Sequence, residues 1–382
     1  MQEDFHYYAT YCAAYLAGYS HGEALDICYS AQFVDLCSRT YLKHIQAPLS
    51  AATTQLQLEM MEARTDKLGL QDITRIWASF HFLPYDLEAV PPFKCGRRYR
   101  DKYRMICKPN GALVKDTVEN ARFKNLQAVG VAMHVMADTW AHQNFAGTPS
   151  LAMNNTNDYF FEILPDGSER QISLSHNPRA EEDPEKGKYT GSIYQPNENS
   201  IMNLGHGRAG HLPDYSFARY RYLPAWGAYE EILKDNPSDY LHAFTQMIHA
   251  MKYLRGAQEE FCLDTYDLEA IAENEERIRT ILMTRQVDAS ADWKKFGEEL
   301  SCEKIPVFDQ DAYEQEYLEA DKDDKNETFL GKFILAALSH KSLVTNKIFS
   351  TGNRLAGISV DFEEKGFRGI RDFRLLMGKE NR

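Results

Sequence analysis

The sequence has few cysteines and no close pair of them. Among its 382 residues, seven are cysteines, and no two form a CxxC pair: Cys12, Cys28, Cys37, Cys95, Cys107, Cys262 and Cys302. An odd and scattered set of this kind excludes the common thiolate zinc motifs and argues against a disulfide framework. We therefore expect reduced thiols, the first three of them as small residues of the core.

Long apolar runs are also missing. The sequence has no stretch of about 20 apolar residues, so it predicts no membrane-spanning segment. The first residues, MQEDFHYYATYC, do not show a basic segment followed by an apolar one, which is the pattern of a secretory signal. We therefore expect a cytoplasmic protein.

Positive charge is scarce. The chain carries 43 Lys and Arg residues against 56 Asp and Glu residues, a formal net charge of -13. Stable binding to nucleic acid or to an anionic membrane depends on basic patches, so we expect neither. An enzyme that acts on phosphates is not excluded, because bound cations would reverse the local charge. The sequence has no P-loop, no dinucleotide fingerprint and no nucleophile elbow.

The residues that are present indicate a large, mainly helical core. Hydrophobic residues make up 43% of the chain and aromatic residues 12%. Apolar residues recur at helical spacing along most of it, which predicts a mainly α fold. Ser20 and Glu23 form a candidate capping box at the start of the second helix. We expect helices at about residues 4–18, 20–42, 116–145, 217–234, 238–258, 266–285, 310–320 and 326–346.

A polar segment, residues 148–204, interrupts the helical pattern. Within it, YFFEILPDGSERQISLS has two extended apolar runs around an Asp-Gly turn, which predicts a β-hairpin. Long loops inside compact domains are commonly lids or binding segments, so this insertion is a candidate lid. We expect residues 1–260 to form a metal-binding helical domain and residues 261–382 a C-terminal helical extension packed on the same core.

The most informative stretch is VGVAMHVMADTWAHQNFAG, residues 129–147, in which His134, Asp138 and His142 recur at every fourth position. Four helical residues rotate about 400°, so the three side chains share one face and rise about 6 Å per step. One ion cannot span the roughly 12 Å from the first to the last, which predicts two ions with Asp138 as a bridge. The alternative is an ordinary helix with a packed histidine, a solvated acid and an imidazole near its end.

Further donors occur earlier in the chain. His6 lies near the start, Asp35 lies among Phe33, Val34 and Leu36, and His81 lies in an FHF sequence that Pro84 ends. A buried carboxylate without a partner is too costly, so Asp35 is exposed, paired or bound to a metal. His81 is either a hydrogen-bonded core residue or a ligand.

A second dense group follows the polar segment. NLGHGRAGHLPDYSF places His206, His211 and Asp214 within nine positions, between glycines that let the backbone pack closely. Two histidines and a carboxylate make a plausible half-shell for one ion. The alternative is a glycine-rich turn with solvent-exposed histidines.

Together these residues supply nitrogen and oxygen donors without any cysteine. Such a set suits zinc, iron or manganese, and zinc is the common choice for hydrolysis. We therefore expect two or three zinc ions, with iron or manganese as alternatives. Closely spaced ions activate water and stabilise charge on a phosphodiester, so the set predicts a metal-dependent hydrolase.

The order of these donors resembles that of the zinc-dependent phospholipase C and single-strand nuclease superfamily. More narrowly, DFHYYATY, YSAQFVD, FHFLP, HVMADTWAHQNFAG and GHGRAGHLPD look like the signatures of an uncharacterised bacterial family related to it. This narrow resemblance spans about residues 4–220, whereas the wider one rests on ligand order. It implies a multi-helix, phospholipase C/nuclease-like domain that holds up to three zinc ions.

The resemblance also implies an assignment of ligands. Carried onto this sequence, it gives three groups: Asp35, His81, His134 and Asp138 for one ion; Asp138 and His6 for a second; His142, His211 and Asp214 for a third. Secreted members of the superfamily use the amine and carbonyl of a mature N-terminal residue as ligands, and Asp4 is a candidate replacement here. His206 competes with His211 for the late position.

The expected activity is hydrolysis of a phosphodiester or related phosphate ester, with Asp35 or Asp138 orienting the attacking water. The substrate would be a small-molecule or lipid phosphate ester, and the acidic balance favours a small or soluble one. Two alternatives stay open: a non-hydrolytic metalloprotein that senses, braces or binds a partner, and an iron enzyme that activates oxygen. The sequence leaves the oligomeric state open.

Overall fold

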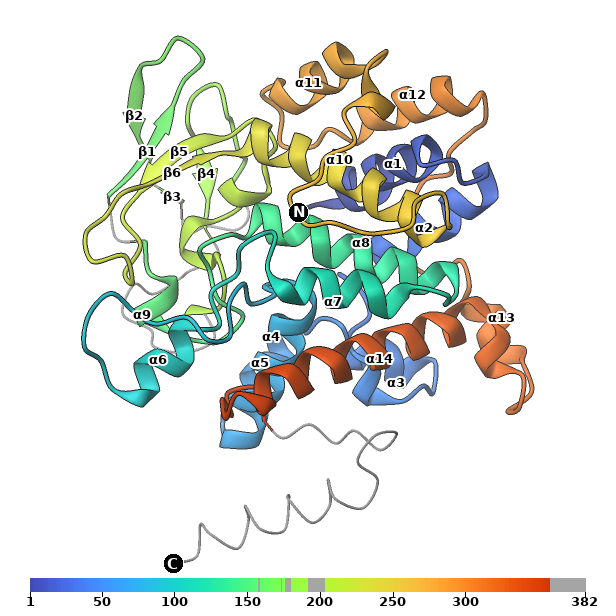
Figure 1. Ribbon diagram of the computed structural model, residues 1–382, viewed down its shortest axis with the longest axis horizontal. Helices are drawn as coiled ribbons and strands as arrows, with labels where there is room; N and C mark the ends of the chain where they lie inside the picture. Colours follow the sequence, from blue (N-terminus) through green and yellow to red (C-terminus); the bar gives the residue numbers. More distant parts are fainter. Residues whose placement is uncertain (157–158, 173, 176–179, 192–202, 358–382) are drawn as a thin grey trace, which may run out of the picture.

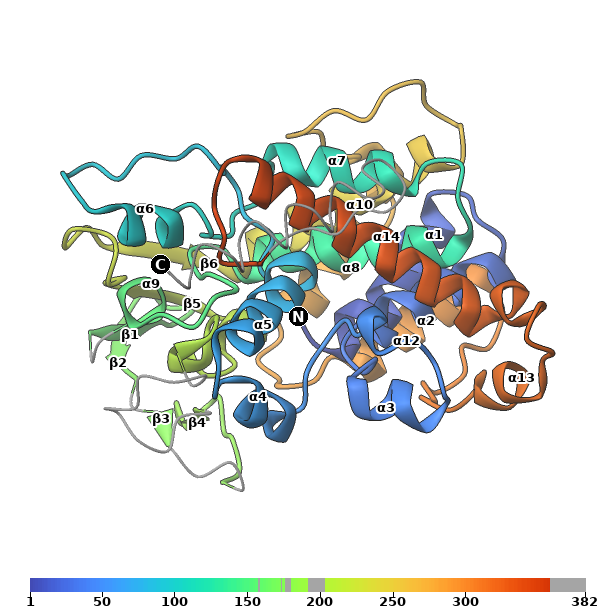
Figure 2. The same cartoon turned by 90° about the horizontal axis from the view of Figure 1, so that it is seen from below.

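Helices dominate the computed structural model, which describes residues 1–156, 159–172, 174–175, 180–191 and 203–357. The strands lie at one end of the molecule and α13 at the other (Figures 1 and 2). The mainly α fold with a small sheet confirms the expectation from the sequence. The α-helices are α1 Thr10–Leu16, α2 His21–Phe33, α3 Arg39–His44, α4 Gln57–Ala63, α5 Lys67–Phe80, α6 Arg97–Tyr103, α7 Ala112–Ala121, α8 Leu126–Ala141, α9 Leu151–Asn154, α10 Asn236–Leu254, α11 Glu275–Met283, α12 Ser290–Ser301, α13 Glu314–Glu319 and α14 Phe329–Ser350.

Helix α8 runs through the middle of the core. It packs against α2, α10, α14 and α7, and from Gln127 to Ala141 every residue is buried. The contact with α2 is close at Gly130, where an added Cβ would lie 2.4 Å from the Ile27 carbonyl oxygen. Glycine is therefore required at this position for the two helix backbones to approach each other.

The N-terminal segment enters the core as a π-helix, Asp4–Ala9, that continues into α1. All six residues of the π-helix are buried. Short π-helical turns are rare and often lie at functional sites. The predicted capping box at the start of α2 is confirmed, since the Ser20 hydroxyl accepts from the Glu23 amide and the Glu23 carboxylate accepts from the Ser20 amide.

The small sheet contains the predicted hairpin. Strands β1 Phe160–Ile163 and β2 Glu169–Gln171 pair antiparallel around the Asp-Gly turn, with Phe161 opposite Gln171. Two later strands, β5 Arg219–Tyr222 and β6 Ile232–Asp235, complete a four-stranded sheet in the order β2-β1-β5-β6. A separate parallel pair joins β3 Leu174–Ser175 and β4 Tyr189–Thr190.

Strands β5 and β6 show that the helix expected over 217–234 was wrong. Residues 219–222 alternate, with Tyr220 and Tyr222 fully buried and Arg219 and Arg221 more exposed. This period of two is that of a strand, and Pro224 and Gly227 prevent a helix from continuing between the strands.

The single central helix expected over 116–145 was also wrong, because the chain forms α7 and α8 there. Phe123 between them adopts φ +61°, which no α-helix accommodates. Asn125 then caps α8, its side chain accepting from the Ala128 amide at 2.9 Å. A helix that carries its own N-cap starts a new direction rather than extending the previous helix.

The C-terminal helices pack on the same hydrophobic core as the rest of the described chain. Trp293 of α12 and Phe333 of α14 belong to the cluster that contains Met133 and Val135 of α8. The boundary expected near residue 260 stays a prediction, and parts of the 148–204 insertion and of the 261–382 extension lie outside the described residues. Among the described residues, no helix is long and apolar enough to cross a membrane. The seven cysteines are free, and Cys12, Cys28 and Cys37 are buried as expected.

Candidate metal centre

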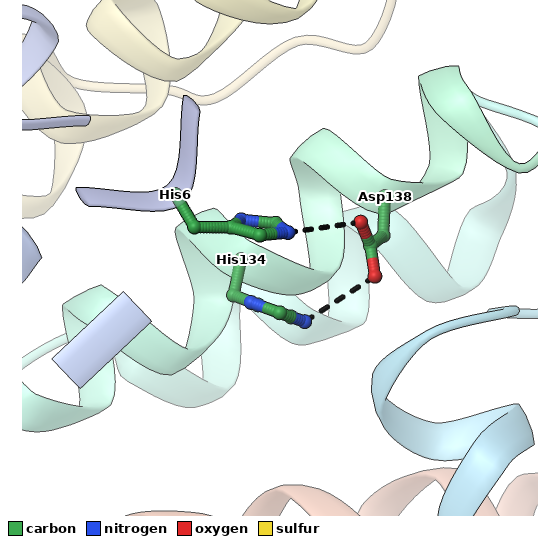
Figure 3. Close-up of side chains that lie close together, drawn as sticks. All are labelled: His6, His134 and Asp138. Carbon is green, nitrogen blue, oxygen red and sulfur yellow. Dashed lines mark hydrogen bonds and ion pairs between the residues drawn. The ribbon is translucent and has the colours of Figure 1, made fainter. Parts of the chain in front are cut away.

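Asp138 lies at the middle of a cluster built from five parts of the chain. It projects from α8 together with His134, one turn earlier, and the π-helix brings His6 against the same face (Figure 3). His6 Nε2 lies 3.1 Å from Asp138 Oδ1, and His134 Nε2 lies 3.2 Å from Asp138 Oδ2. The two imidazole rings stack with their centroids 3.8 Å apart. These three buried residues form the first group that could hold a metal ion.

A second group shares His134 with the first. It consists of Asp35, in the turn after α2, His81, at the end of α5, and His134. His81 Nδ1 lies 3.6 Å from Asp35 Oδ1 and 3.3 Å from His134 Nε2. The Asp35 side chain is 30% exposed, whereas His81 and His134 are buried, so solvent reaches this group beside Asp35.

The third group lies at the end of α8. His142, the residue that ends the helix, has its Nε2 3.1 Å from Asp214 Oδ1, and His206 Nε2 lies 3.5 Å from Asp214 Oδ2. The glycine-rich loop reaches this point because Gly205, at φ +53°, lies against Phe82, where a Cβ would be 2.1 Å from the ring. His211 also contacts Asp214, at 3.4 Å, but its side chain is 51% exposed.

Four histidines of the cluster are held by backbone carbonyl groups on the side that faces away from it. Each carbonyl oxygen can only accept, so the ring nitrogen beside it carries the proton and the opposite nitrogen presents a lone pair toward the carboxylates. This is the arrangement typical of metal-ligating histidines. The bonds run from His134 Nδ1 to Ala31 at 2.8 Å, from His142 Nδ1 to His81 at 2.7 Å, from His81 Nε2 to Thr53 at 3.0 Å, and from His206 Nδ1 to Gly210 at 2.8 Å.

Burial and charge set the protonation states that ligands need. Burial lowers the pKa of His6 and that of His206 to about 4. Burial opposes ionisation of Asp138, but His142, the chain's amino group and His134 together hold the pKa of Asp138 well below its usual value. The pKa of Asp214 is also held well below its usual value, chiefly by His206 and the amino group. Neutral imidazoles and ionised carboxylates are the forms that bind metal ions.

The amino group of Met1 lies between the inner groups and the outer one. It is 2.7 Å from Asp138 Oδ1, 3.3 Å from Asp214 Oδ1 and 3.1 Å from His142 Nε2. Burial alone would lower its pKa, but the carboxylates of Asp138, Asp214 and Asp35 raise it to about 11. The sequence did not indicate this contact, since a methionine at the start of a chain carries no signal of its own.

Asp4 does not replace the N-terminal amino group as a ligand of the centre. Its Oδ2 accepts from the Ala289 amide at 3.1 Å, and it belongs to none of the three His/Asp groups.

The structure brings together eight of the predicted donors: His6, Asp35, His81, His134, Asp138, His142, His206 and Asp214, with His211 at the edge. For the outer group, it places His206 rather than His211 among the three mutually close donors.

The donor set fits metal ions. It consists of imidazole nitrogens and carboxylate oxygens, and the three groups contain no cysteine. Zinc, iron and manganese all accept such a set, and one ion for each group gives the expected maximum of three.

Comparison with known proteins gave one match. The model of a family of unknown function (DUF6765) matches residues 1–348, a range that contains every residue of the centre. This confirms the expected resemblance to an uncharacterised family. Neither the curated proteins nor the solved structures gave a match, and the relation to the phospholipase C and nuclease superfamily stays a prediction.

Proposed function

The chain belongs to the DUF6765 family, and we propose that it is a metal-dependent hydrolase of a phosphodiester or related phosphate ester. The observation that carries the proposal is the set of anchored imidazoles, whose free nitrogens converge on the ionised Asp138 and Asp214. A histidine that only supports the fold needs one anchored ring nitrogen, and nothing requires its other nitrogen to face a carboxylate. His134, His81 and His142 all have a second nitrogen that faces one.

We assign metal binding and the orientation of the attacking water to different carboxylates of the chain. Asp138 is 1% exposed, and its Oδ1 contacts His6 of the first group while its Oδ2 contacts His81 of the second, which suits a bridging ligand. Asp35 is the carboxylate of the centre that solvent reaches, so it is the residue that can orient an attacking water molecule. Two or three closely spaced divalent cations, which we expect to be zinc, would lower the pKa of water and neutralise charge on phosphate oxygens.

The exposure of the Asp35 side chain favours hydrolysis over a purely structural role for the metal ions. A structural zinc site is closed, whereas a catalytic site leaves one position open to solvent or substrate. Asp35 opens one side of the second group, and His211 does the same for the third. We expect a small or soluble ester as the substrate, in keeping with the net charge of -13.

The test is hydrolysis of bis(4-nitrophenyl) phosphate, a chromogenic phosphodiester, and of 4-nitrophenyl phosphate. Protein purified without chelators should release nitrophenolate, lose this activity after treatment with a chelator, and regain it with zinc. Asp35→Asn, which keeps one oxygen donor, should lower kcat by about 100-fold or more, with a smaller change in metal content. His249→Ala is the matched control, because His249 is a buried histidine outside the three groups. Full metal content without hydrolysis of either ester would favour the non-hydrolytic alternative.

A further inference from the structure

Helices α4 and α5 pack against each other as a short hairpin that exposes apolar side chains. Five large hydrophobic residues within 56–70 are 40–73% exposed: Leu56, Leu58, Met61, Leu68 and Leu70. Single exposed hydrophobic residues are normal, but several of them on one pair of elements mark an interaction site. We refer to these five residues as the α4–α5 surface.

Helix α4 is covered on one side only. Met60 and Ala63 pack against the small cluster that contains Leu204. Leu58 and Met61, three residues apart, lie on roughly the opposite side of the helix. None of the seven residues of α4 is buried by the described part of the chain. A helix this short is marginal in water without packing, so we expect a further segment to cover Leu58 and Met61.

The described chain ends beside this surface. Helix α14 packs against α5 (Figures 1 and 2), and Arg75 Nε of α5 donates to the Ala356 carbonyl oxygen at 3.1 Å. Gly357, the last described residue, lies against Gln71, since an added Cβ would be 3.5 Å from Gln71 Cβ. Gln71 and Arg75 follow Leu68 by three and seven residues, so all three share one face of α5. The chain therefore leaves the described part about one helical turn from the α4–α5 surface.

The sequence beyond this point contains a segment that suits such a surface. Residues 358–382 lie outside the described part of the chain. Apolar residues recur there at three- and four-residue spacing, which predicts an amphipathic helix over 367–377: Phe367, Ile370, Phe373, Leu376 and Met377. Arg368, Arg371 and Arg374 each directly follow one of the first three, which places a row of arginines along one edge of the apolar stripe.

Charge favours the same chain as the partner of this segment. Residues 365–379 carry five Lys and Arg residues against one Asp, whereas the whole chain has a net charge of -13. Glu62 is exposed and follows Met61 on α4, so it offers a negative charge at the edge of the α4–α5 surface. A segment on so short a tether also has an effective concentration on the order of millimolar, which favours docking within one chain.

We infer that the segment 367–377 docks on the α4–α5 surface of its own chain, with its apolar stripe over Leu58, Met61 and Leu68. Its arginines then face Glu62, and the open side of α4 is covered. The inference does not depend on the proposed function, because no metal ion and no hydrolytic step enters it.

Docking at this place reaches the metal centre through both helices of the hairpin. Glu59 of α4 accepts from the Thr40 amide and hydroxyl, both at 2.7 Å. Asp72 of α5 pairs with Arg39, also at 2.7 Å. Both partners lie shortly after Asp35, the carboxylate of the centre that solvent reaches. A docked segment therefore stabilises the helices that hold the chain after Asp35.

Chymotrypsin tests the docking in the full-length protein, because it cleaves after aromatic residues that docking would cover. Cleavage after Phe367 and Phe373, followed by mass spectrometry, should be about tenfold or more faster in the variant Leu58→Lys with Met61→Lys than in the wild type. Lysine keeps the helix propensity of these exposed positions and repels the arginines, so the fold is retained. Met283→Lys, at an exposed residue of α11, is the matched control and should be cleaved like the wild type. Equal rates in the wild type and the double variant would overturn the inference.

A variant of the segment tests the same contact from the other side. Ile370→Asp with Phe373→Asp leaves the sequence of the described part of the chain unchanged. Amide hydrogen exchange over residues 36–44 and 56–64 should be faster in this variant than in the wild type. Phe362→Asp, which precedes the periodic run, is its control and should exchange like the wild type. Wild-type protection of these amides in the first variant would contradict the docking.

Two other occupants of the surface give different results. If a second copy of the chain supplied the segment, cleavage by chymotrypsin would slow as the protein concentration rises, and light scattering would show a dimer. If a lipid surface were the partner, the wild-type segment would be cleaved as fast as that of the double variant and would be protected only by vesicles that contain phosphatidylglycerol. Either result overturns docking within one chain. Slow cleavage that is independent of protein concentration and of vesicles supports it.

Discussion

His134 Nδ1 donates to the carbonyl oxygen of Ala31 at 2.8 Å, across the contact between α8 and α2. This bond fixes the orientation of an imidazole that belongs to both inner groups of the metal centre. The same contact holds Asp35, because the turn that carries it follows directly after α2. The spacing between these two helices therefore controls the geometry of the centre.

Gly130→Ala should disturb that spacing. The added methyl group would lie 2.4 Å from the Ile27 carbonyl oxygen and 2.5 Å from Ser30 Cβ, so the helices must move apart. We expect the free energy of unfolding of the metal-free protein to fall by about 1 to 3 kcal/mol, measured by urea denaturation. Gly22→Ala is the control, since nothing lies within 4 Å of the Cβ position in the same helix pair. Equal stability of the two variants would show that the contact is looser than described.

Asp138→Asn should remove more than one metal ion per chain. Asp138 Oδ1 faces His6 of the first group, while its Oδ2 lies 3.3 Å from His81 Nδ1 of the second, so a loss of charge here weakens two sites at once. The measurement is metal content by plasma mass spectrometry. His249→Ala should keep the wild-type content, because His249 Nε2 accepts from the Cys262 amide and lies outside the three groups. Unchanged metal in the Asp138 variant would refute its bridging role.

His206→Ala and His211→Ala test which histidine of the glycine-rich loop is the ligand in the outer group. His206 lies within the outer group, with its Nδ1 anchored to Gly210, whereas the His211 side chain is half exposed. The first variant should lose about one ion per chain and the second should retain it, as measured by metal content after dialysis. The opposite result would restore the assignment that the family resemblance implied.

Acid should destabilise the metal-free protein through buried histidines. Burial lowers the pKa of His6, His206 and His340 from 6.5 to about 4. Between these values the unfolded chain binds protons that the folded chain does not, so the free energy of unfolding falls as pH decreases from 6.5 to 4. Each of these three histidines contributes up to about 1.4 kcal/mol per pH unit to the slope of the free energy of unfolding against pH.

His340 allows this to be tested outside the metal centre. Its Nε2 donates to the Ser79 carbonyl oxygen at 2.7 Å, a bond that the amide of a glutamine can make in its place. Urea denaturation at several pH values should give a smaller slope for His340→Gln than for the wild type. A slope as steep as that of the wild type would mean that His340 is protonated in the folded state.

Local pattern predicted the part of the centre that lies on one helix. His134, Asp138 and His142 follow from the rotation of an α-helix, and the histidines of the glycine-rich loop follow from their close spacing. The contact of His6 with the metal-binding face of α8 depends on a π-helical turn. The position of Asp35 beside the same face depends on the close contact between α2 and α8 at Gly130. These are tertiary features, so the sequence indicated the residues but not which pairs would touch.

The errors have a similar origin. A helix is the wrong prediction at Tyr220 and Tyr222, because aromatic residues fit both helical and alternating patterns over a short run. Their partner strand β1 lies about 60 residues earlier, and only pairing with it selects the strand. The break before α8 rests on one residue at positive φ, Phe123, and aromatic residues rarely adopt such a conformation.

The most direct test is the metal content of the wild-type protein, purified without chelators and without a metal-binding tag. We predict two or three zinc ions per chain, held by the groups around Asp138 and Asp214. Iron in their place would keep the centre but contradict the hydrolytic assignment. Less than one ion per chain after supplementation with zinc, iron and manganese would contradict the account as a whole.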